Sequence, residues 1–184
     1  MAYKWLMYDP ITHIPFIVWD NRTGRGATSQ GEVEDLVSLM DIGPTILEAA
    51  GIDVPTYLEG RSLAPYLNGD DPEPHPYVFC EDNYQIMMRS TTHKLVYYVG
   101  QEAGELYDLQ EDPGELYNRW DDPAYGAVRV QLERDLLAWV TSSAYWNAGY
   151  KRHRDRHTRM RWPMDGQANL HGRASVENQF TKTW

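Results

Sequence analysis

The pattern of apolar and polar residues in the first part of the chain predicts strands followed by a helix. Two short apolar runs, residues 15–19 and 33–40, have the composition of buried strands. The second run leads into a predicted helix over residues 41–51, in which Asp41 suits the N-cap and Gly51 suits the stop. Its apolar stripe consists of Ile46, Leu47 and Ala50. A strand that leads directly into a helix is typical of α/β proteins.

The pattern changes after residues 69–76, where prolines and a glycine exclude regular structure. Four short β-prone runs with brief connections then predict an antiparallel meander, and they are residues 77–81, 85–89, 94–99 and 105–109. A helix is predicted from about Pro123 with Asp122 as its cap. One face of this helix would be formed by Val128, Leu132, Leu136 and Val140.

These patterns divide the chain into three parts. We expect residues 1–70 to be the end of an α/β domain, residues 77–145 to be a subdomain of antiparallel sheet and helix, and residues 146–184 to be a basic, aromatic tail. Residues 1–145 carry 9 basic and 24 acidic residues, whereas the tail carries 8 and 3. The acidic body argues against a nucleic-acid partner. The tail would suit nucleic acid or acidic lipid, but a contact with the acidic body of its own or a second subunit, which would make a homo-oligomer, is the simpler interpretation.

Composition limits the cellular setting. No apolar run approaches the roughly 20 residues that cross a bilayer, so no membrane partner is expected. No signal peptide is visible at the N-terminus, and the single cysteine, Cys80, excludes an internal disulfide, so a cytoplasmic location is expected. Because nothing basic adjoins Cys80 in its β-prone run, we interpret it as a buried structural thiol.

Three segments of the chain resemble sulfatases. Residues 4–18 resemble the family pattern K-x-x-x-Y-[ED]-x-x-x-R-x-P-x-I-V. Residues 37–52 and 60–65 match D-[IL]-x-P-T-[IL]-L-x-x-A-G-I and G-x-S-L-x-P. Residues 94–98 and 105–118 look like the family's Y-K-L and E-L-Y-D-L-x-x-D-P-x-E-x-x-N. Each pattern alone is weak, but three in the family's order are a specific signal.

The resemblance implies an α/β fold, namely the C-terminal part of an alkaline-phosphatase-like sheet followed by a small antiparallel sheet packed on a C-terminal helix. It also implies hydrolysis of a sulfate ester, together with a missing N-terminal half of the protein. Alone, the chain is expected to be inactive.

Two residues of the first segment are candidate catalytic residues by this resemblance. Lys4 matches the family's lysine that reaches the sulfate ester, where an ammonium opposes the charge on the transferred group. At about 4 Å and an effective dielectric near 20, such a contact is worth roughly 4 kcal/mol before desolvation. His13 stands where many members have arginine, so a fixed charge is replaced by one that depends on pH.

The other two segments are interpreted as scaffold. Residues 41–51 read as a capped, packed helix. Asp108 and Asp112 suit turn and cap positions, and Glu115 and Asn118 would lie in a short helical turn that follows.

The family's reactive groups are absent from this sequence. Sulfatases convert the Cys or Ser of C/S-x-P-x-R to formylglycine, but Glu-Asp-Asn-Tyr follows Cys80 and no serine fits the motif. The aspartates that bind the family's divalent metal, usually Ca²⁺, are also missing, so no metal ligand is expected in this chain.

Two alternatives stay open at this point. Residues 12–15, Thr-His-Ile-Pro, also resemble phosphonate and phosphate monoester hydrolases of the same superfamily. The chain would otherwise be a non-catalytic, truncated module that acts in assembly. An in-frame C/S-x-P-x-R in the DNA directly upstream would favour an enzyme.

Overall fold

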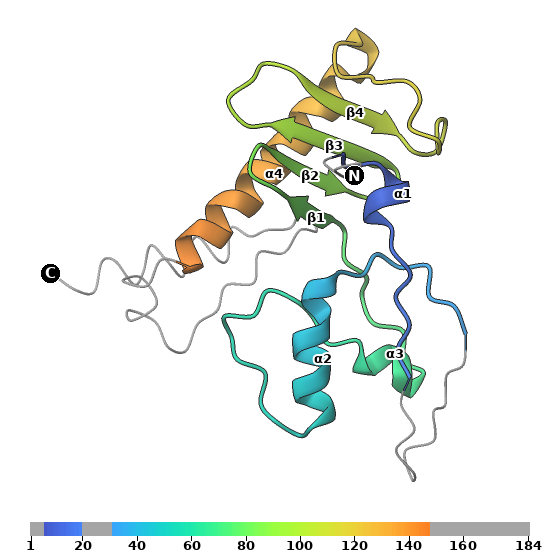
Figure 1. Ribbon diagram of the computed structural model, residues 1–184, viewed down its shortest axis with the longest axis vertical. Helices are drawn as coiled ribbons and strands as arrows, with labels where there is room; N and C mark the ends of the chain where they lie inside the picture. The colour runs from blue at the N-terminus through green and yellow to red at the C-terminus, as the bar shows by residue number, and fades with distance from the viewer. Residues whose placement is uncertain (1–5, 20–30, 148–184) are drawn as a thin grey trace, which may run out of the picture. The chain divides into compact units, whose positions relative to one another are not determined.

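The computed structural model describes residues 6–19 and 31–147. Backbone packing divides the chain into two units, Met1–Leu132 and Glu133–Trp184. The first unit contains a four-stranded sheet, the helices α1 to α3 and the first turns of α4 (Figure 1). Lys4 and the tail beyond Asn147 lie outside the described residues, so the expectations for them stay predictions.

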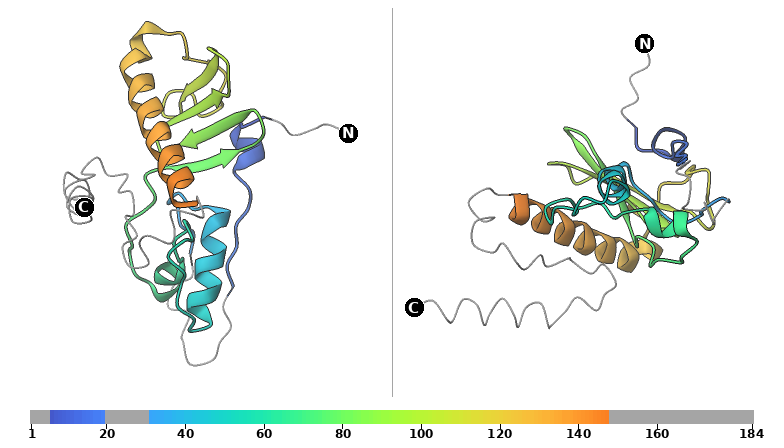
Figure 2. Two further views of the ribbon diagram at one scale, coloured as in Figure 1. Left: turned by 90° about the vertical axis from the view of Figure 1, so that its left-hand side faces the viewer. Right: turned by 90° about the horizontal axis from the view of Figure 1, so that it is seen from below.

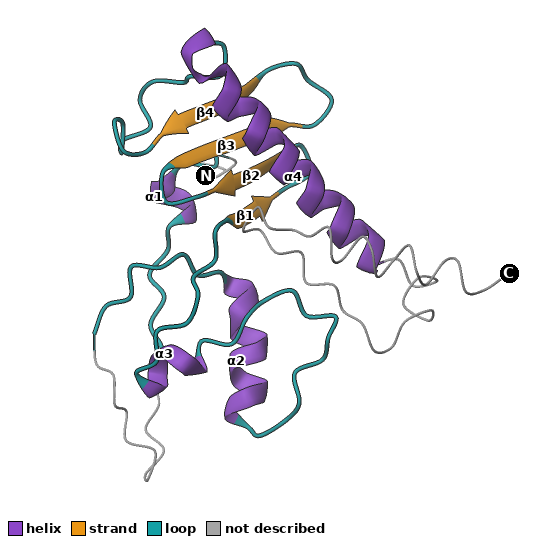
Figure 3. Ribbon diagram, turned by 180° about the vertical axis from the view of Figure 1, so that it is seen from behind, coloured by secondary structure: helices purple, strands orange, loops and turns teal. Residues whose placement is uncertain are grey.

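The sheet is the antiparallel meander that the sequence predicts. Its strands are β1 (Val78–Glu81), β2 (Gln85–Arg89), β3 (His93–Tyr98) and β4 (Gly104–Asp108), and each strand pairs with the next (Figure 3). In the register, Met88 lies opposite Leu95, and Leu95 lies opposite Leu106. All four strands lie within one residue of their predicted bounds. The prediction succeeds because each strand pairs with its neighbour in sequence, so the apolar pattern and the short turns determine where a strand begins and ends.

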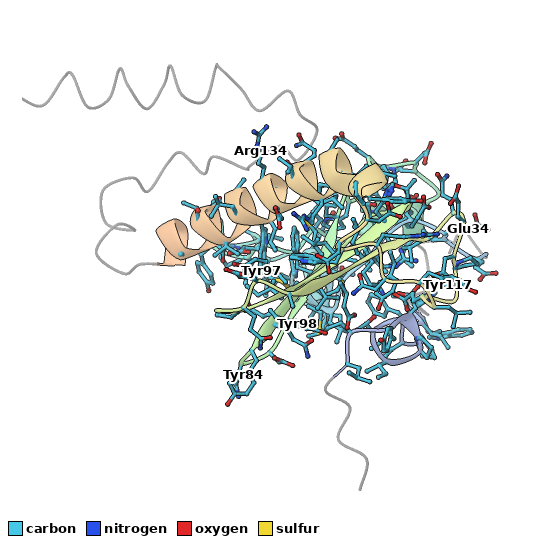
Figure 4. The ribbon with its side chains drawn as sticks, turned by 90° about the horizontal axis from the view of Figure 1, so that it is seen from above. Glu34, Tyr84, Tyr97, Tyr98, Tyr117 and Arg134 are labelled. Atoms are coloured by element: carbon cyan, nitrogen blue, oxygen red, sulfur yellow. The ribbon has the colours of Figure 1, made fainter. Side chains whose placement is uncertain are left out.

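The two faces of the sheet bury different residues. Because side chains alternate along a strand, Met88, Leu95 and Leu106 share one face, and all three are buried. On the other face, Met87 and Val96 pack with Met7, which comes from the N-terminal segment. The neighbours Tyr97 and Tyr98 in β3 accordingly point to opposite sides of the sheet (Figure 4).

The N-terminal segment meets the second face of the sheet and then leaves it. After Met7 the chain forms α1 (Asp9–Thr12), a single turn with proline near its start. Residues 15–19 then run without regular structure, so the strand predicted there is wrong for this chain. Ile17 is 86% exposed and Trp19 is 84% exposed. A strand needs a hydrogen-bonded neighbour, and the described residues form no strand beside this segment.

The second predicted strand is also absent. Residues 33–38 have no regular structure, and a 3₁₀ turn, η1 (Leu39–Asp41), leads into α2 (Ile42–Ala49). Ser38 and Asp41 form a capping box at the start of η1, in which each side chain accepts a backbone N–H near the other residue. The predicted side-chain cap of α2 by Asp41 is not present. Gly51, at φ 71°, ends the helix as expected.

The buried face of helix α2 is formed by other residues than its predicted apolar stripe. Pro44 and Thr45 are buried, whereas Ile46 is 61% exposed. Leu47 is half-buried whereas Ile46 and Ala50 are exposed, so the apolar stripe packs only in part. The short helix α3 (Ala64–Asn68) follows and ends at Gly69 in the left-handed conformation.

The last described helix has the predicted cap and apolar face. Asp122 accepts a hydrogen bond from the Ala124 backbone at 3.0 Å, and η2 (Pro123–Tyr125) leads into α4 (Gly126–Asn147) (Figure 2). On the predicted face, Leu132 and Leu136 are buried. Arg129 in the first turns donates to the Trp120 carbonyl at 2.7 Å and stacks on the Trp120 ring. Of the helices described, none is long and apolar enough to span a bilayer.

Candidate functional site

Of the two candidate catalytic residues in the first segment, His13 lies within the described structure and Lys4 does not. Lys4 precedes the described residues, and His13 follows α1 with an exposed side chain. The backbone N–H of His13 donates to the Asp9 carbonyl at 2.8 Å, which closes the turn of α1. The structure therefore fixes the backbone of His13 through Asp9.

Asp9 belongs to a buried group of charged residues around Lys94. Lys94 belongs to β3, an inner strand of the sheet. Its side chain is 0% exposed although it carries a charge. Its Nζ contacts the Met7 carbonyl at 3.0 Å, Asp9 Oδ1 at 2.5 Å, and Glu115 Oε1. The first two contacts are hydrogen bonds, whereas Glu115 Oε1 is an ion-pair partner without a hydrogen bond of its own. We call Asp9, Arg89, Lys94 and Glu115 the Lys94 cluster.

The cluster is balanced in charge. Arg89 donates from Nε and Nη2 to the two Asp9 oxygens at 3.2 and 3.1 Å, which makes a bidentate pair. Glu115 Oε2 accepts the Asp9 backbone N–H at 2.7 Å. Two cations therefore meet two carboxylates, so the charges of the buried Lys94 and Glu115 and the partly exposed Asp9 and Arg89 balance.

The electrostatics hold Asp9 in its charged form. Burial by itself raises the pKa of the Asp9 carboxyl, but hydrogen bonds and charge from Arg89 and Lys94 outweigh it and leave the pKa below its ordinary value. Asp9 is therefore a fixed carboxylate at neutral pH, which suits holding a structure and does not suit moving a proton.

Glu115 reaches the cluster from a strained backbone. Among the described residues that are not glycine, it has the single positive φ, at 55°. A left-handed conformation costs a residue with a β-carbon about 1 kcal/mol or more. The contacts of its carboxylate with Lys94 and the Asp9 backbone compensate for that cost.

The rest of the third segment organises the backbone around β4. Asn118 Oδ1 accepts the N–H groups of Leu106 and Trp120 at 3.0 and 2.9 Å, and Asn118 Nδ2 donates to the Gly104 carbonyl at 3.0 Å. Asp112 Oδ2 accepts the Tyr117 N–H at 2.8 Å. The scaffold interpretation of this segment fits these contacts, but the predicted helical turn is replaced by irregular turns because side chains, not an i→i+4 ladder, bind the backbone.

The second segment is organised by one buried carboxylate. Asp41 Oδ1 accepts the Arg61 N–H at 2.7 Å, Asp41 Oδ2 accepts the Ser38 N–H at 2.8 Å, and His75 Nε2 lies 3.2 Å from both oxygens. Burial raises the pKa of Asp41, but the bonds from His75, Arg61 and Ser38 leave it below its ordinary value. Asp41 thus joins three loops and contributes scaffold.

Sequence reasoning missed the ionic partners in both places. It placed Lys94 in a family pattern and Glu115 in a helical turn without assigning either an ionic partner, and it did not single out Arg89 or His75. The available signal was a lysine directly before the apolar pair Leu95-Val96 within a predicted strand, since a charge in such a run needs a buried partner.

Among the described residues, Cys80 has the properties of a structural thiol, and no group of side chains could hold a metal ion. Cys80 is half-buried, and burial, followed by the nearby Asp82 and Glu81, raises the pKa of its thiol, which makes it a poor nucleophile. In residues 6–19 and 31–147, no three His, Cys, Asp or Glu side chains are grouped so that they would hold a metal ion. The described residues therefore do not form the metal centre that the resemblance implies.

The lowered carboxyl pKa values of Asp9 and Asp41 predict acid lability. A carboxyl with a lower pKa in the folded state than in the unfolded chain adds stability above about pH 4, and this stability is lost as the pH falls through the lowered value. We expect the urea midpoint to fall between pH 5 and pH 2. Asp41→Asn should lower the midpoint at pH 7 and flatten its pH dependence, and an unchanged slope would contradict the assignment to Asp41.

Comparison with known proteins places most of the chain in one group. Residues 2–142 match the family model described as N-sulphoglucosamine sulphohydrolase, C-terminal. The chain is 34% identical over 148 residues to a Delta 4,5-hexuronate-2-O-sulfatase of Bacteroides thetaiotaomicron, which covers 74% of this chain and 30% of that protein. It is 33% identical over 127 residues to arylsulfatase K of Homo sapiens, covering 60% of this chain and 23% of the relative.

A solved structure supports the fold. The phosphonate monoester hydrolase of Agrobacterium radiobacter matches with a TM-score of 0.53 and 30% identity, over 61% of this chain and 27% of that one. The expected fold class is thereby confirmed. The chain spans less than a third of the length of each of these relatives.

Proposed function

The chain belongs to the sulfatase family, as a C-terminal portion, and from this we propose that it forms part of an enzyme that hydrolyses sulfate esters. The observation that supports the proposal best is the way the family's first segment is held. Residues of the first and third segments, Asp9, Lys94 and Glu115, meet in one buried cluster. Such a connection is expected if the third segment supports a first segment that contacts substrate.

In this proposal the chain contributes binding groups for the sulfate. Lys4 would place an ammonium against the sulfate oxygens, where negative charge develops as the ester bond breaks. His13 would be a second donor from the other end of α1, since its side chain is exposed and its backbone is fixed.

We further propose that a separate N-terminal portion covers part of this chain. Apolar side chains are exposed in residues 14–19, where Ile17 and Trp19 are more than four-fifths exposed, and on α2 at Ile46. Exposed apolar groups of this size are typical of a surface that another polypeptide covers. The relatives are more than three times as long as the part that matches, so they contain enough additional chain to do so.

The same N-terminal portion would supply the reactive groups. The described residues offer no metal centre, so we propose that the divalent ion, Ca²⁺ by family resemblance, is held there together with the formylglycine nucleophile. The metal would supply charge that polarises the sulfate.

A phosphonate or phosphate monoester hydrolase is the alternative enzyme. The solved phosphonate monoester hydrolase has 30% identity and a TM-score of 0.53, which favours this reading independently of the sulfatases. Comparing kcat/KM for p-nitrophenyl sulfate with kcat/KM for a phenylphosphonate ester distinguishes the two, because discrimination between substrates is the ratio of these values.

Activity measurements test the proposal directly. The purified 184-residue chain should not hydrolyse p-nitrophenyl sulfate, and activity should appear when it is co-expressed with the upstream coding sequence. In that complex Lys4→Ala should reduce kcat about 100-fold, as loss of a charge-stabilising donor does. Turnover by the chain alone would refute the need for a second portion. A complex without esterase activity would refute the enzyme and favour an assembly module.

A further inference from the structure

Little apolar surface holds the first segment on the sheet. We call residues 7–13 the strap. Met7 packs against Met87, and the Tyr8 ring lies 6.0 Å from that of Tyr107. None of the residues of α1 is buried. The strap therefore gains little from hydrophobic burial, which is the dominant favourable contribution to the stability of most folded segments.

The Lys94 cluster attaches the strap by charge. Asp9 pairs with Lys94 and Arg89, and Glu115 accepts the Asp9 backbone N–H at 2.7 Å. The Met7 carbonyl accepts a hydrogen bond from Lys94 Nζ at 3.0 Å. Each of these contacts uses a carboxylate or the ammonium that balances it, so the strength of the attachment depends on the charges of the cluster.

Lys94 lies under the strap. Its side chain is 0% exposed, and both Asp9 and the Met7 carbonyl contact its Nζ. A buried ammonium without a counter-charge is strongly unfavourable. If the carboxylates beside it were neutralised, Lys94 would be more stable in water. Detaching the strap would expose it without breaking the pairing of the strands.

The opposite face of the sheet has a core of its own. Met88, Leu95 and Leu106 are buried there, and each strand is paired with the next. Neither this core nor the strand pairing uses a residue of the strap. The strap can therefore open locally while the sheet stays folded.

We propose that the strap is a conformational device that opens by itself when the charges of the Lys94 cluster no longer balance. Opening detaches residues 7–13 while β1 to β4 stay paired. It exposes Lys94 and releases the His13 backbone, whose N–H the Asp9 carbonyl accepts at 2.8 Å. The inference is independent of the proposed function, because it needs neither a substrate nor a second portion of the enzyme.

Acid is one way to unbalance the cluster. Asp9 is faced by Arg89 from β2, Lys94 from β3 and Glu115 from the turn after β4. Burial raises the pKa of the Asp9 carboxyl, but Arg89 and Lys94 outweigh burial and leave the pKa below its ordinary value. Asp9 therefore stabilises the closed strap above about pH 4, and this contribution is lost as the pH falls through the lowered value. The strap should open on acidification before the sheet unfolds.

Hydrogen exchange in the 184-residue chain tests this inference. The amides of Ile11, Thr12 and His13 donate within the strap, so their protection factors measure its opening. At pH 7, Asp9→Asn should lower these protection factors at least about tenfold, while those of β2 and β3 stay unchanged. In the unchanged chain, acidification from about pH 5 to about pH 3 should have the same selective effect.

Chemical labelling of Lys94 gives a second readout. The ammonium is 0% exposed under the closed strap, so it should react slowly with acetic anhydride. Asp9→Asn should speed this reaction at least about tenfold, as measured by mass spectrometry of the peptide that contains Lys94. A rate no faster than in the unchanged chain would mean that the strap does not open to expose Lys94.

Asp41→Asn provides the matched control. Asp41 is also a buried carboxylate with a lowered pKa, but its partners are Ser38, Arg61 and His75. This variant removes a comparable charge from the chain without touching the cluster. It should leave the protection of the strap amides and the rate of labelling unchanged.

Every other outcome contradicts the proposal. Strap amides without protection at pH 7 in the unchanged chain would mean that the strap is not closed. Strap amides that keep their protection in Asp9→Asn would mean that charge does not hold it. Loss of protection in β2 and β3 together with the strap would mean that the strap has no opening of its own. Equal opening in Asp41→Asn would show that a general loss of stability is responsible.

Discussion

Lys94→Met should destabilise the chain by about 3–5 kcal/mol, the loss expected when one partner of a buried ionic group is removed. Methionine fills a similar volume but donates no hydrogen bond. It would leave the Met7 carbonyl without its lysine donor, and the charges of Asp9 and Glu115 would be only partly compensated. Arg89 would still pair with Asp9, so Glu115 would lose more of its charge compensation than Asp9 would. Urea unfolding at pH 7 measures the change.

Two further variants make this experiment interpretable. Arg119→Gln removes an ion pair with Asp122 that is partly exposed on both sides, and it should cost about 1 kcal/mol or less. Adding Glu115→Gln to Lys94→Met removes the carboxylate left without its lysine and should recover part of the loss. A cost for Lys94→Met as small as that for Arg119→Gln would mean that the ammonium is not buried.

Gly60→Ala should have the second large effect, a loss of about 3 kcal/mol or more. A β-carbon at this position would lie 2.0 Å from the Met40 carbonyl oxygen and 2.9 Å from the Asp41 nitrogen. Both atoms belong to the backbone, so neither can rotate away. If residues 40–41 and residue 60 moved apart, the hydrogen bond from the Arg61 N–H to Asp41 would also weaken.

The control for Gly60→Ala lies within α2. A β-carbon on Gly43 would meet only the Leu58 side chain, at an ordinary 4.0 Å. Gly43→Ala should therefore be neutral or stabilise by up to about 1 kcal/mol, because alanine favours the helix. Thermal unfolding of the two variants compares them directly, and equal midpoints would contradict the close approach at Gly60.

The elements that the sequence predicts correctly have partners close by in the chain. Strands β1 to β4 each pair with a neighbour after a short turn, and the cap at Asp122 lies beside its own helix. The strands predicted at residues 15–19 and 33–40 fail for the opposite reason. Their apolar composition is suited to a sheet, but the described chain contains no strand that pairs with them.

The candidate site shows the same division. His13 was found through a family pattern, and the structure shows its backbone fixed and its side chain exposed, while Lys4 stays a prediction. The sequence could indicate that Lys94 needs a buried partner but not which residues pair, because Lys94 and Asp9 are 85 residues apart and Glu115 and Asp9 are 106 apart. Charges at such separations have no periodicity that would indicate their pairing. The left-handed backbone of Glu115 has no sequence signal either, since glycine or asparagine is the usual residue there.

The long separation within the Lys94 cluster has a consequence for biosynthesis. Residues 7–9 leave the ribosome before Lys94 and Glu115 have been translated, and closing such a long loop is entropically unfavourable until the sheet exists. Residues 7–9 therefore acquire their final position only after β3 and the turn at Glu115 have formed. In a nascent chain, the start of α1 would be one of the last parts to be set in place.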